Sequence, residues 1–393
     1  MAEAARTRQV VALGITQTIA WASSTYLPAV LAVPIAASLG TAPNLIFAAF
    51  SFSLVVNGLL GPAVGRVIDR RGGRGVLCLS NVILALGLAL LGLTTGPLTL
   101  FLAWGIVGAG MALGLYDAAF AALVRIHGLG ARGPITGITL LGGFASTIGW
   151  PATAWMAAHW DWRTACFVWA GLHVALALPL NGISIPRVVG SQATSAAERP
   201  AHGVVPPPGQ RRNFLLVAIF AAATAFVTSA MAAHMPGLLA LTGAGATAAI
   251  AAAALVGPAQ VVARLVEFLA ERRYRTPPLL TARVATALHP LAGMLLLGLG
   301  GNPLLLATFA LLHGAGNGLI TIAKGTLPLA LFGVAGYGAR QGVLAVAQRI
   351  MQAAAPFLFG LLLDGGGPQA ALGLSVAVSL VALATLFALR QPA

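Results

Sequence analysis

The sequence predicts an all-α membrane protein with twelve transmembrane helices in two pseudo-symmetric six-helix bundles. Of its 393 residues, 59% are hydrophobic and only 8% are charged, and the mean hydropathy is +0.92. Soluble domains carry roughly a quarter charged residues, so most of this chain must face lipid. Twelve apolar runs and a one-sided distribution of arginines are the other two observations. Together they exclude a cytosolic enzyme or a nucleic-acid binder, although the net charge is +14.

The first half of the chain contains six apolar runs that can each cross a bilayer, which takes about 20 mainly apolar residues. Glycine and proline occur inside several of them, and membrane helices tolerate both. These runs form the predicted N-terminal six-helix bundle, residues 1–185. Their ranges are 10–36, 44–64, 75–93, 98–124, 135–157 and 164–184.

Residues 186–212 interrupt the apolar pattern, because they are polar, basic and rich in proline. Such a segment cannot bury enough apolar surface to fold alone, so we predict a cytoplasmic linker. Six more apolar runs follow and form the predicted C-terminal bundle, residues 213–393. Their ranges are 213–235, 246–269, 279–299, 303–327, 341–363 and 369–389.

The basic residues predict the orientation of the chain. If the N-terminus is inside, the inner loops and both ends carry 18 of the 22 lysines and arginines, whereas the outer loops carry only Arg163. Positive charge marks the cytoplasmic side, and an even number of spans returns the C-terminus to it. We therefore expect a multi-pass protein of a bacterial-type inner (plasma) membrane with both termini in the cytoplasm.

The two halves resemble each other weakly. Leu27-Pro28 corresponds to Met235-Pro236 at an offset of 208 residues, and Gly108-Ala109-Gly110 corresponds to Gly314-Ala315-Gly316 at an offset of 206. The nearly constant offset predicts a structural repeat, which is common in transporters.

The loop after the second span reads Gly65-Arg66-Val67-Ile68-Asp69-Arg70-Arg71-Gly72-Gly73-Arg74. It resembles the signature loop of the major facilitator superfamily, and the six-plus-six spans and the basic linker extend that resemblance over the whole chain. The resemblance implies a cytoplasmic gate in which Asp69 faces the N-terminus of the eleventh span and the arginines tie neighbouring helix ends. The matching landmarks are Gly65, Asp69, Arg70, Gly72 and Arg74.

Four ionisable residues stand out inside predicted spans, where charge is costly and usually functional. They are Asp117, Arg264, Lys324 and Arg349. Asp117, Arg264 and Arg349 lie eight or nine residues from an arginine at the cytoplasmic boundary, about 12 Å deep at 1.5 Å per residue. Lys324 lies one residue beyond the repeat image of Asp117, so we expect a similar depth. Three cations against one acid leave a surplus of positive charge, which an anionic substrate would neutralise.

Other interpretations of these residues remain open. Asp117 carries a proton or forms a structural ion pair with Lys324 or Arg349, and the two arginines can also snorkel to the inner interface. His234 is the repeat image of Tyr26 and faces a cavity or packs as a buried histidine.

Two short segments resemble the monocarboxylate and oxalate–formate exchanger branch of the superfamily. Gln260-Val261-Val262-Ala263-Arg264 is similar to an Asp-x-x-Ala-Arg segment, with Gln260 in place of the acid, and residues 137–145 resemble a glycine-rich fifth span. The branch implies anion-binding cations at Arg264 and Arg349. Multidrug antiporters often carry an arginine where this chain has Trp104, and the Gly-Pro motif of their fifth span appears here only as Gly149-Trp150-Pro151.

The predicted function is secondary active transport by alternating access, most simply of a small carboxylate-like anion by proton coupling or exchange. The alternative is proton-coupled efflux of drugs or other hydrophobic or cationic metabolites. A non-transporting receptor is disfavoured because the linker is too short for a signalling domain, and no residues for an enzyme, a metal site or a cofactor are evident. We expect a monomer in the lipid bilayer, with possible protons and no nucleic acid as partners. The substrate-binding candidates are Arg264, Arg349, Lys324, Tyr26 and His234, and the coupling candidate is Asp117.

Overall fold

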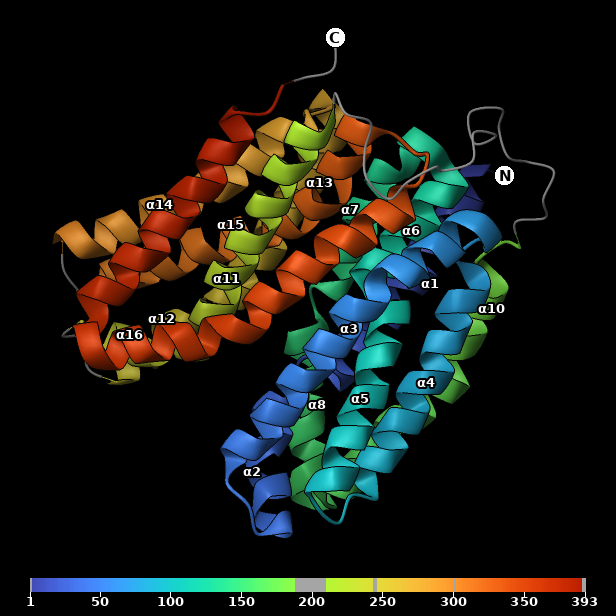
Figure 1. Ribbon diagram of the computed structural model, residues 1–393, viewed down its shortest axis with the longest axis horizontal. Helices are drawn as coiled ribbons and strands as arrows, with labels where there is room; N and C mark the ends of the chain where they lie inside the picture. The colour runs from blue at the N-terminus through green and yellow to red at the C-terminus, as the bar shows by residue number, and fades with distance from the viewer. Residues whose placement is uncertain (1, 188–209, 243–245, 300–301, 391–393) are drawn as a thin grey trace. The chain divides into compact units, whose positions relative to one another are not determined.

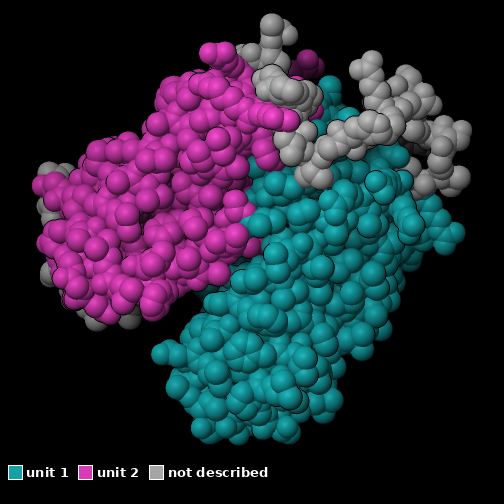
Figure 2. Space-filling view, in the orientation of Figure 1, with its two compact units in different colours: residues 1–204, 333–346 teal, residues 205–332, 347–393 magenta. Residues whose placement is uncertain are grey.

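The computed structural model describes residues 2–187, 210–242, 246–299 and 302–390, so most of the predicted linker lies outside the described residues. The chain forms two compact units, which Figure 2 shows in different colours. Unit 1 comprises residues 1–204 and 333–346, and unit 2 comprises residues 205–332 and 347–393. The start of the predicted eleventh span therefore packs with the N-terminal helices. Each unit is described by itself below.

Unit 1 contains the first ten α-helices (Figure 1). They are α1 (Ala2–Ser23), α2 (Pro28–Leu39), α3 (Pro43–Arg71), α4 (Arg74–Gly92), α5 (Pro97–Gly114), α6 (Tyr116–His127), α7 (Arg132–Gly142), α8 (Ala145–His159), α9 (Trp162–Leu172) and α10 (Leu178–Ser184). A π-helical segment, His173–Ala177, joins α9 to α10.

Unit 2 contains five further helices and most of a sixth. They are α11 (Arg211–Leu241), α12 (Ala246–Ala254), α13 (Val256–Tyr274), α14 (Pro278–Leu299), α15 (Pro303–Phe332) and α16 (Tyr337–Phe387). The last helix is bent at Gly367, whose φ of 73° is readily accessible to glycine.

The described residues contain ten apolar helical stretches that are long enough to cross a membrane. Two of them, Pro97–His159 and Tyr337–Phe387, have 63 and 51 residues. At 1.5 Å per residue these lengths are about 95 and 76 Å, which is more than twice the roughly 30 Å of a hydrocarbon core. Each of the two therefore provides two crossings, and the fold has the twelve spans that the sequence predicts.

Three spans of unit 1 are interrupted near their middles. The first breaks between α1 and α2 at residues 24–27, the fourth breaks at Leu115 between α5 and α6, and the fifth breaks at residues 143–144 between α7 and α8. Leu115 has extended backbone angles (φ −76°, ψ −175°), so the helix ends there, although its N–H still donates to Met111 (3.0 Å) and its carbonyl accepts from Ala119 (3.1 Å). The runs 10–36, 98–124 and 135–157 are thus not single helices.

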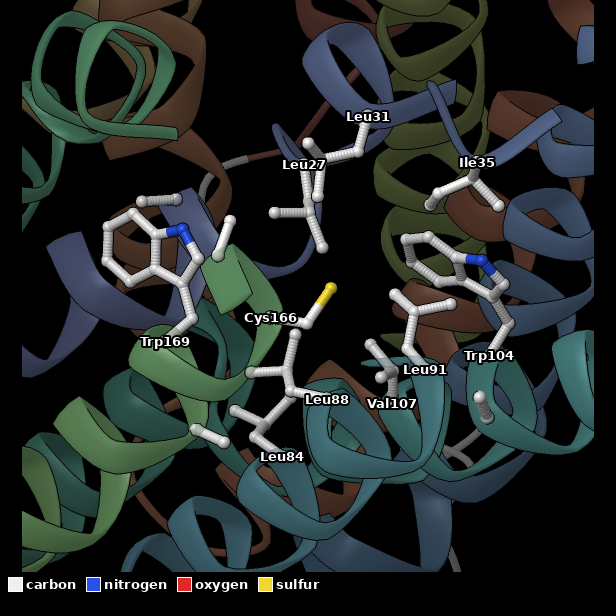
Figure 3. Packing of buried hydrophobic residues seen from close by; sticks show 14 of the residues in the cluster. Leu27, Leu31, Ile35, Leu84, Leu88, Leu91, Trp104, Val107, Cys166 and Trp169 are labelled. Atoms are coloured by element: carbon white, nitrogen blue, oxygen red, sulfur yellow. The ribbon is translucent and has the colours of Figure 1, made fainter. Parts of the chain in front are cut away.

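The apolar core of unit 1 lies among α2, α4, α5 and α9, as Figure 3 shows. Leucines of α2 and α4 meet there, together with Trp104 of α5 and Cys166 and Trp169 of α9, and all of these side chains are buried. Unit 2 has its own core around Met231, Phe309 and Phe359, from α11, α15 and α16. Each bundle therefore holds itself together by its own packing.

The repeated Gly-Ala-Gly segment has the same packing role in both units. A β-carbon at Gly108 would collide with Ser53 of α3, and one at Gly110 would collide with Leu84 of α4. In unit 2, a β-carbon at Gly314 would collide with Val256 of α13, and one at Gly316 would collide with His289 of α14. In each half, the first glycine thus allows close packing against the second span of that half, and the last glycine allows close packing against the third span.

Candidate transport site

The C-terminal half of α3 packs against the start of α16 through glycines. Gly61 and Gly65 lie one turn apart on α3, and Gly338 and Gly342 lie one turn apart on α16. A β-carbon at Gly65 would overlap the carbonyl of Gly338, and one at Gly342 would overlap the carbonyl of Gly61. We call these four residues the glycine contact. Its backbones approach so closely that no side chain fits between them.

Asp69 secures this contact by capping α16. Its two carboxylate oxygens accept hydrogen bonds from the backbone N–H groups of Gly338 (2.9 Å) and Ala339 (2.8 Å). These N–H groups belong to the first turn of α16, where a negative charge is stabilised by the helix dipole. Arg125 and Arg340 interact electrostatically with the same carboxylate, and Arg340 also donates to the carbonyl of Gly333 (2.8 Å).

The other residues of the signature loop lie around the junction of α3 and α4. Arg70 is exposed in the last turn of α3, where a cation suits the helix C-terminus. Gly72 caps that helix with a φ of 80° and donates its N–H to Ile68. Arg74 begins α4 and is half-buried. The loop thus places charge at helix ends on the predicted cytoplasmic side.

Asp117 lies at the interruption of the fourth span. It is half-buried in the first turn of α6, two residues after Leu115. A small cavity of about 10 Å³ adjoins it, which is near the smallest volume that holds one water molecule. Asn57 of α3 also lines this cavity, and its buried Nδ2 has no hydrogen-bond partner in the structure. The cavity therefore offers a carboxylate and an amide donor to one small polar guest.

Side chains from other helices bind backbone carbonyls near the interruptions. Gln17 of α1 donates to the carbonyl of Gly114 (2.6 Å), and Ser80 of α4 donates to that of Gly110 (2.8 Å). Thr18 donates to Leu141 at the end of α7 (3.1 Å). Such bonds stabilise irregular backbone, because a bare carbonyl at membrane depth costs several kcal/mol.

Tyr26 lies in the interruption between α1 and α2, within a group of aromatic rings. Trp150 of α8 donates its Nε1–H to the carbonyl of Tyr26 (3.2 Å), and the two rings meet edge to face at 5.6 Å. Trp21 lies 6.2 Å from the ring of Tyr26 and 5.0 Å from that of Tyr116. We call Trp21, Tyr26, Tyr116 and Trp150 the aromatic group.

In unit 2, Arg264 is 5% exposed and lies between α13 and α15. It donates to the carbonyl of Gly318 (3.3 Å) and to the side-chain oxygens of Gln260 (3.3 Å) and Thr321 (3.4 Å). These distances are longer than the 2.7–3.2 Å typical of N–H···O bonds. These three hydrogen bonds tie the guanidinium to α13 and α15.

Arg349 is 8% exposed on α16 and donates to Gln352 at 2.6 Å. Ser229 of α11 donates to the backbone carbonyl of the same glutamine (2.8 Å). His234 of α11 shares a hydrogen bond with the carbonyl of Pro356 (2.8 Å) and packs near Phe359. Lys324 is half-buried on α15. Two arginines of one bundle are thus buried inside its spans.

Sequence reasoning missed several buried polar residues of unit 1. His173, in the π-helical segment, hydrogen-bonds to Ser23 (2.8 Å) and Asn81 (2.9 Å), and it is fully buried. Thr16 donates to Asn181 (3.2 Å). The available signal was the presence of polar residues inside apolar runs, but their partners lie up to 165 residues away in the chain.

Comparison with known proteins identifies the family. The family model described as Major Facilitator Superfamily matches residues 13–323, which is most of the chain. The chain belongs to the major facilitator superfamily. It is therefore a multi-pass membrane transporter that binds a small-molecule substrate, and it is not an enzyme.

Two solved structures of this superfamily share the fold. The human organic anion transporter MFSD10 (TETRAN) superposes with a TM-score of 0.74 at 16% identity, with 98% of this chain and 99% of that chain covered. The transporter FucP, in its outward conformation, gives 0.73 at 13% identity with the same coverage. A relative from Thermoproteus tenax, described as an uncharacterized 38 kDa protein in a 23S RNA operon, is 34% identical over 133 residues. That match spans about a third of each chain.

Proposed function

We propose that this transporter moves a small organic anion with a carboxylate-like group, by proton coupling or by exchange, through alternating access. The observation that carries the proposal is the environment of Arg264. Its guanidinium is buried in unit 2, yet its hydrogen bonds to Gly318, Gln260 and Thr321 are long. A carboxylate would form shorter, charge-assisted and bidentate bonds with the same fork.

Arg349 and Lys324 support the same proposal because they add positive charge to the spans of unit 2. An anionic substrate would be attracted to this positive charge, because charges interact strongly at membrane depth. His234 and Tyr26 are the further residues that we propose for substrate contact. The organic anions transported by the structurally similar human protein are consistent with this substrate class.

Asp117 is the proposed coupling residue. Its position at the start of α6, beside a cavity for about one water molecule, gives the carboxylate a route for proton exchange. Glycine-lined backbone surrounds that cavity, including Gly61, Gly65 and Gly338. We further propose that the glycine contact and Asp69 form the cytoplasmic gate, in a monomer of the plasma membrane whose termini both face the cytoplasm.

The test is ligand binding by purified protein, measured as thermal stabilisation and by calorimetry. The panel contains small mono- and dicarboxylates, amphiphilic cations and neutral metabolites, each at two pH values. A ligand at 100 times its Kd stabilises the folded state by about 2.7 kcal/mol. We expect carboxylates to stabilise the wild type and Arg264→Gln to lose at least tenfold in their affinity while it remains folded.

The matched control is Arg283→Gln. Arg283 is also an arginine inside unit 2, but it donates to the carbonyl of Leu386 (3.1 Å) and stacks on Phe387. It should bind carboxylates as the wild type does. Unchanged carboxylate affinity in Arg264→Gln would show that the anion site is wrong. Stabilisation by cations alone would instead support the alternative, proton-coupled drug or metabolite efflux through Asp117.

A further inference from the structure

Three polar side chains follow at intervals of four residues from α1 into its interruption. Gln17 and Trp21 lie one turn apart on α1, and Thr25 lies beyond the end of that helix at Ser23. We call these three residues the stripe. In each of them one polar atom is buried and has no hydrogen-bond partner in the structure: Gln17 Oε1, Trp21 Nε1 and Thr25 Oγ1. The whole side chain of Gln17 is only 1% exposed.

Such atoms are expensive, since each buried unsatisfied group costs about 1–3 kcal/mol. Native proteins retain them where a water or a ligand completes the bonding. Of the three atoms, Trp21 Nε1 and Thr25 Oγ1 can donate and Gln17 Oε1 and Thr25 Oγ1 can accept, which matches a neutral hydroxyl or a similar group better than a bare ion. The stripe therefore indicates that a polar ligand group or a water molecule binds at the end of α1.

Aromatic rings surround the same place. Trp21, which belongs to the stripe, also lies 5.0 Å from Tyr116, and Tyr116 itself stacks on Phe120 at 5.3 Å with an interplanar angle of 10°. Trp150 contacts Tyr26 and leaves 45% of its own surface exposed. Trp21 lies in the last turn of α1 and Tyr26 in the interruption that follows, whereas Tyr116 begins α6 and Trp150 lies on α8. The rings therefore come from three broken spans.

We propose that the aromatic group is a subsite for a planar aromatic ring that carries a hydrogen-bonding substituent. Offset and edge-to-face ring pairs favour a flat ring over a saturated ring of similar size. The Gln17–Trp21–Thr25 stripe would bind the substituent. This inference deepens the proposed function, on which it rests, by naming an aromatic substrate class.

The experiment compares two ligands with the same groups and carbon number: 4-hydroxybenzoate and 4-hydroxycyclohexanecarboxylate. Isothermal calorimetry of the full-length protein in detergent measures both. We expect about fivefold tighter binding of the planar ligand, equivalent to about 1 kcal/mol. Trp21→Leu and Trp150→Leu should each reduce that preference to less than twofold.

The control variant is Trp155→Leu. Trp155 lies on the same helix as Trp150 and is similarly exposed (52%), but it stacks on His159 and meets Trp160 edge to face instead of contacting the aromatic group. It should keep the full preference, and thermal unfolding without ligand shows which variants are folded. Equal binding of the two ligands by the wild type would overturn the proposal. A preference that survives in folded Trp21→Leu and Trp150→Leu would overturn it as well.

A neutral pair separates this inference from the anion proposal. Benzyl alcohol and cyclohexylmethanol carry no charge, so they report on the ring subsite alone. If neither carboxylate binds but benzyl alcohol binds better than cyclohexylmethanol, the anion proposal fails and the subsite stands. If no ligand of either pair binds, the stripe holds ordered water only and the subsite is wrong.

Discussion

At the scale of single residues, polar side chains within unit 1 bind backbone carbonyls beside the broken spans. Gln17 binds the carbonyl of Gly114, and Ser80 binds that of Gly110, near the end of α5. Trp150 binds the carbonyl of Tyr26 in the interruption of the first span. Irregular backbone at membrane depth is tolerated where protein groups bind it, and the proposed ligand would lie at such a place.

Asp161, which lies between α8 and α9, provides a prediction at the scale of one residue. It caps α9 by accepting the backbone N–H of Thr164, and this hydrogen bond holds the pKa of its carboxyl below the ordinary value of 3.8. We expect Asp161→Ala to lower the free energy of unfolding by about 1 kcal/mol at neutral pH, as for other lost N-caps. Thermal unfolding of the purified protein measures the change.

The pH dependence of this cap has a definite sign. Since the folded state lowers the pKa, the stabilisation is complete above pH 3.8 and is lost as the pH falls through the lower folded value. Asp161→Asn keeps an acceptor but does not titrate in this range. The stability difference between wild type and Asp161→Asn should therefore change below pH 3.8 and stay constant above it. A constant difference at all pH values would contradict the assignment.

At the scale of elements, the contact between α3 and α16 depends on four glycines and one acid. A pair of small residues one turn apart lets helices approach closely in membranes. Here both helices carry such a pair, and Asp69 adds two hydrogen bonds at the end of the contact. Packing and capping therefore act on the same turn of α16.

We expect Gly65→Ala to disrupt this contact, because its new β-carbon would overlap the carbonyl of Gly338, and a backbone atom cannot rotate away. Overpacking of this kind typically costs about 1–3 kcal/mol. The measurement is the thermal unfolding midpoint, together with transport of a ligand found in the binding screen. Both should fall.

Gly75→Ala is the control for this substitution. Gly75 lies in the first turn of α4, near the same end of α3, but a β-carbon there would meet nothing within 4 Å. It should behave as wild type. If Gly65→Ala matches Gly75→Ala in both measurements, close backbone packing is not required for stability or transport. The proposed gate would then depend on Asp69 and not on the glycine contact.

The interruptions show what the sequence could and could not predict at this scale. Twelve spans were predictable because hydrophobic length is a local property. The break at Leu115 was not, since Leu115 continues an apolar run and the side chains that bind the end of α5, Gln17 and Ser80, lie on other helices. Asp117 was singled out for its charge, but its place in the first turn of α6 depends on that break.

At the scale of the whole molecule, composition and charge distribution predicted the fold class and the family resemblance predicted the superfamily. The repeat was predicted from constant offsets, and the equivalent packing of Gly108 and Gly314 agrees with it. The substrate remains a proposal because it depends on few residues. Arg264 and Arg349 were found as charges, whereas the long bonds of Arg264 and the aromatic group became evident only in three dimensions.

The orientation of the molecule in the membrane is the last prediction, and two glycines allow a matched test. Gly96 precedes α5 on the predicted outer side, and Gly130 follows α6 on the predicted inner side. A β-carbon at either position would meet nothing within 4 Å, so each accepts a cysteine. In intact cells a membrane-impermeant maleimide should label Gly96→Cys and not Gly130→Cys, and inverted vesicles should reverse the result.

Wild-type protein gives the background of Cys78 and Cys166, which lie within spans. The reason is electrostatic, because arginines concentrate on one side of the spans. Labelling of Gly130→Cys from outside would show that the predicted topology is inverted. Asp69 and the glycine contact would then lie on the outer face.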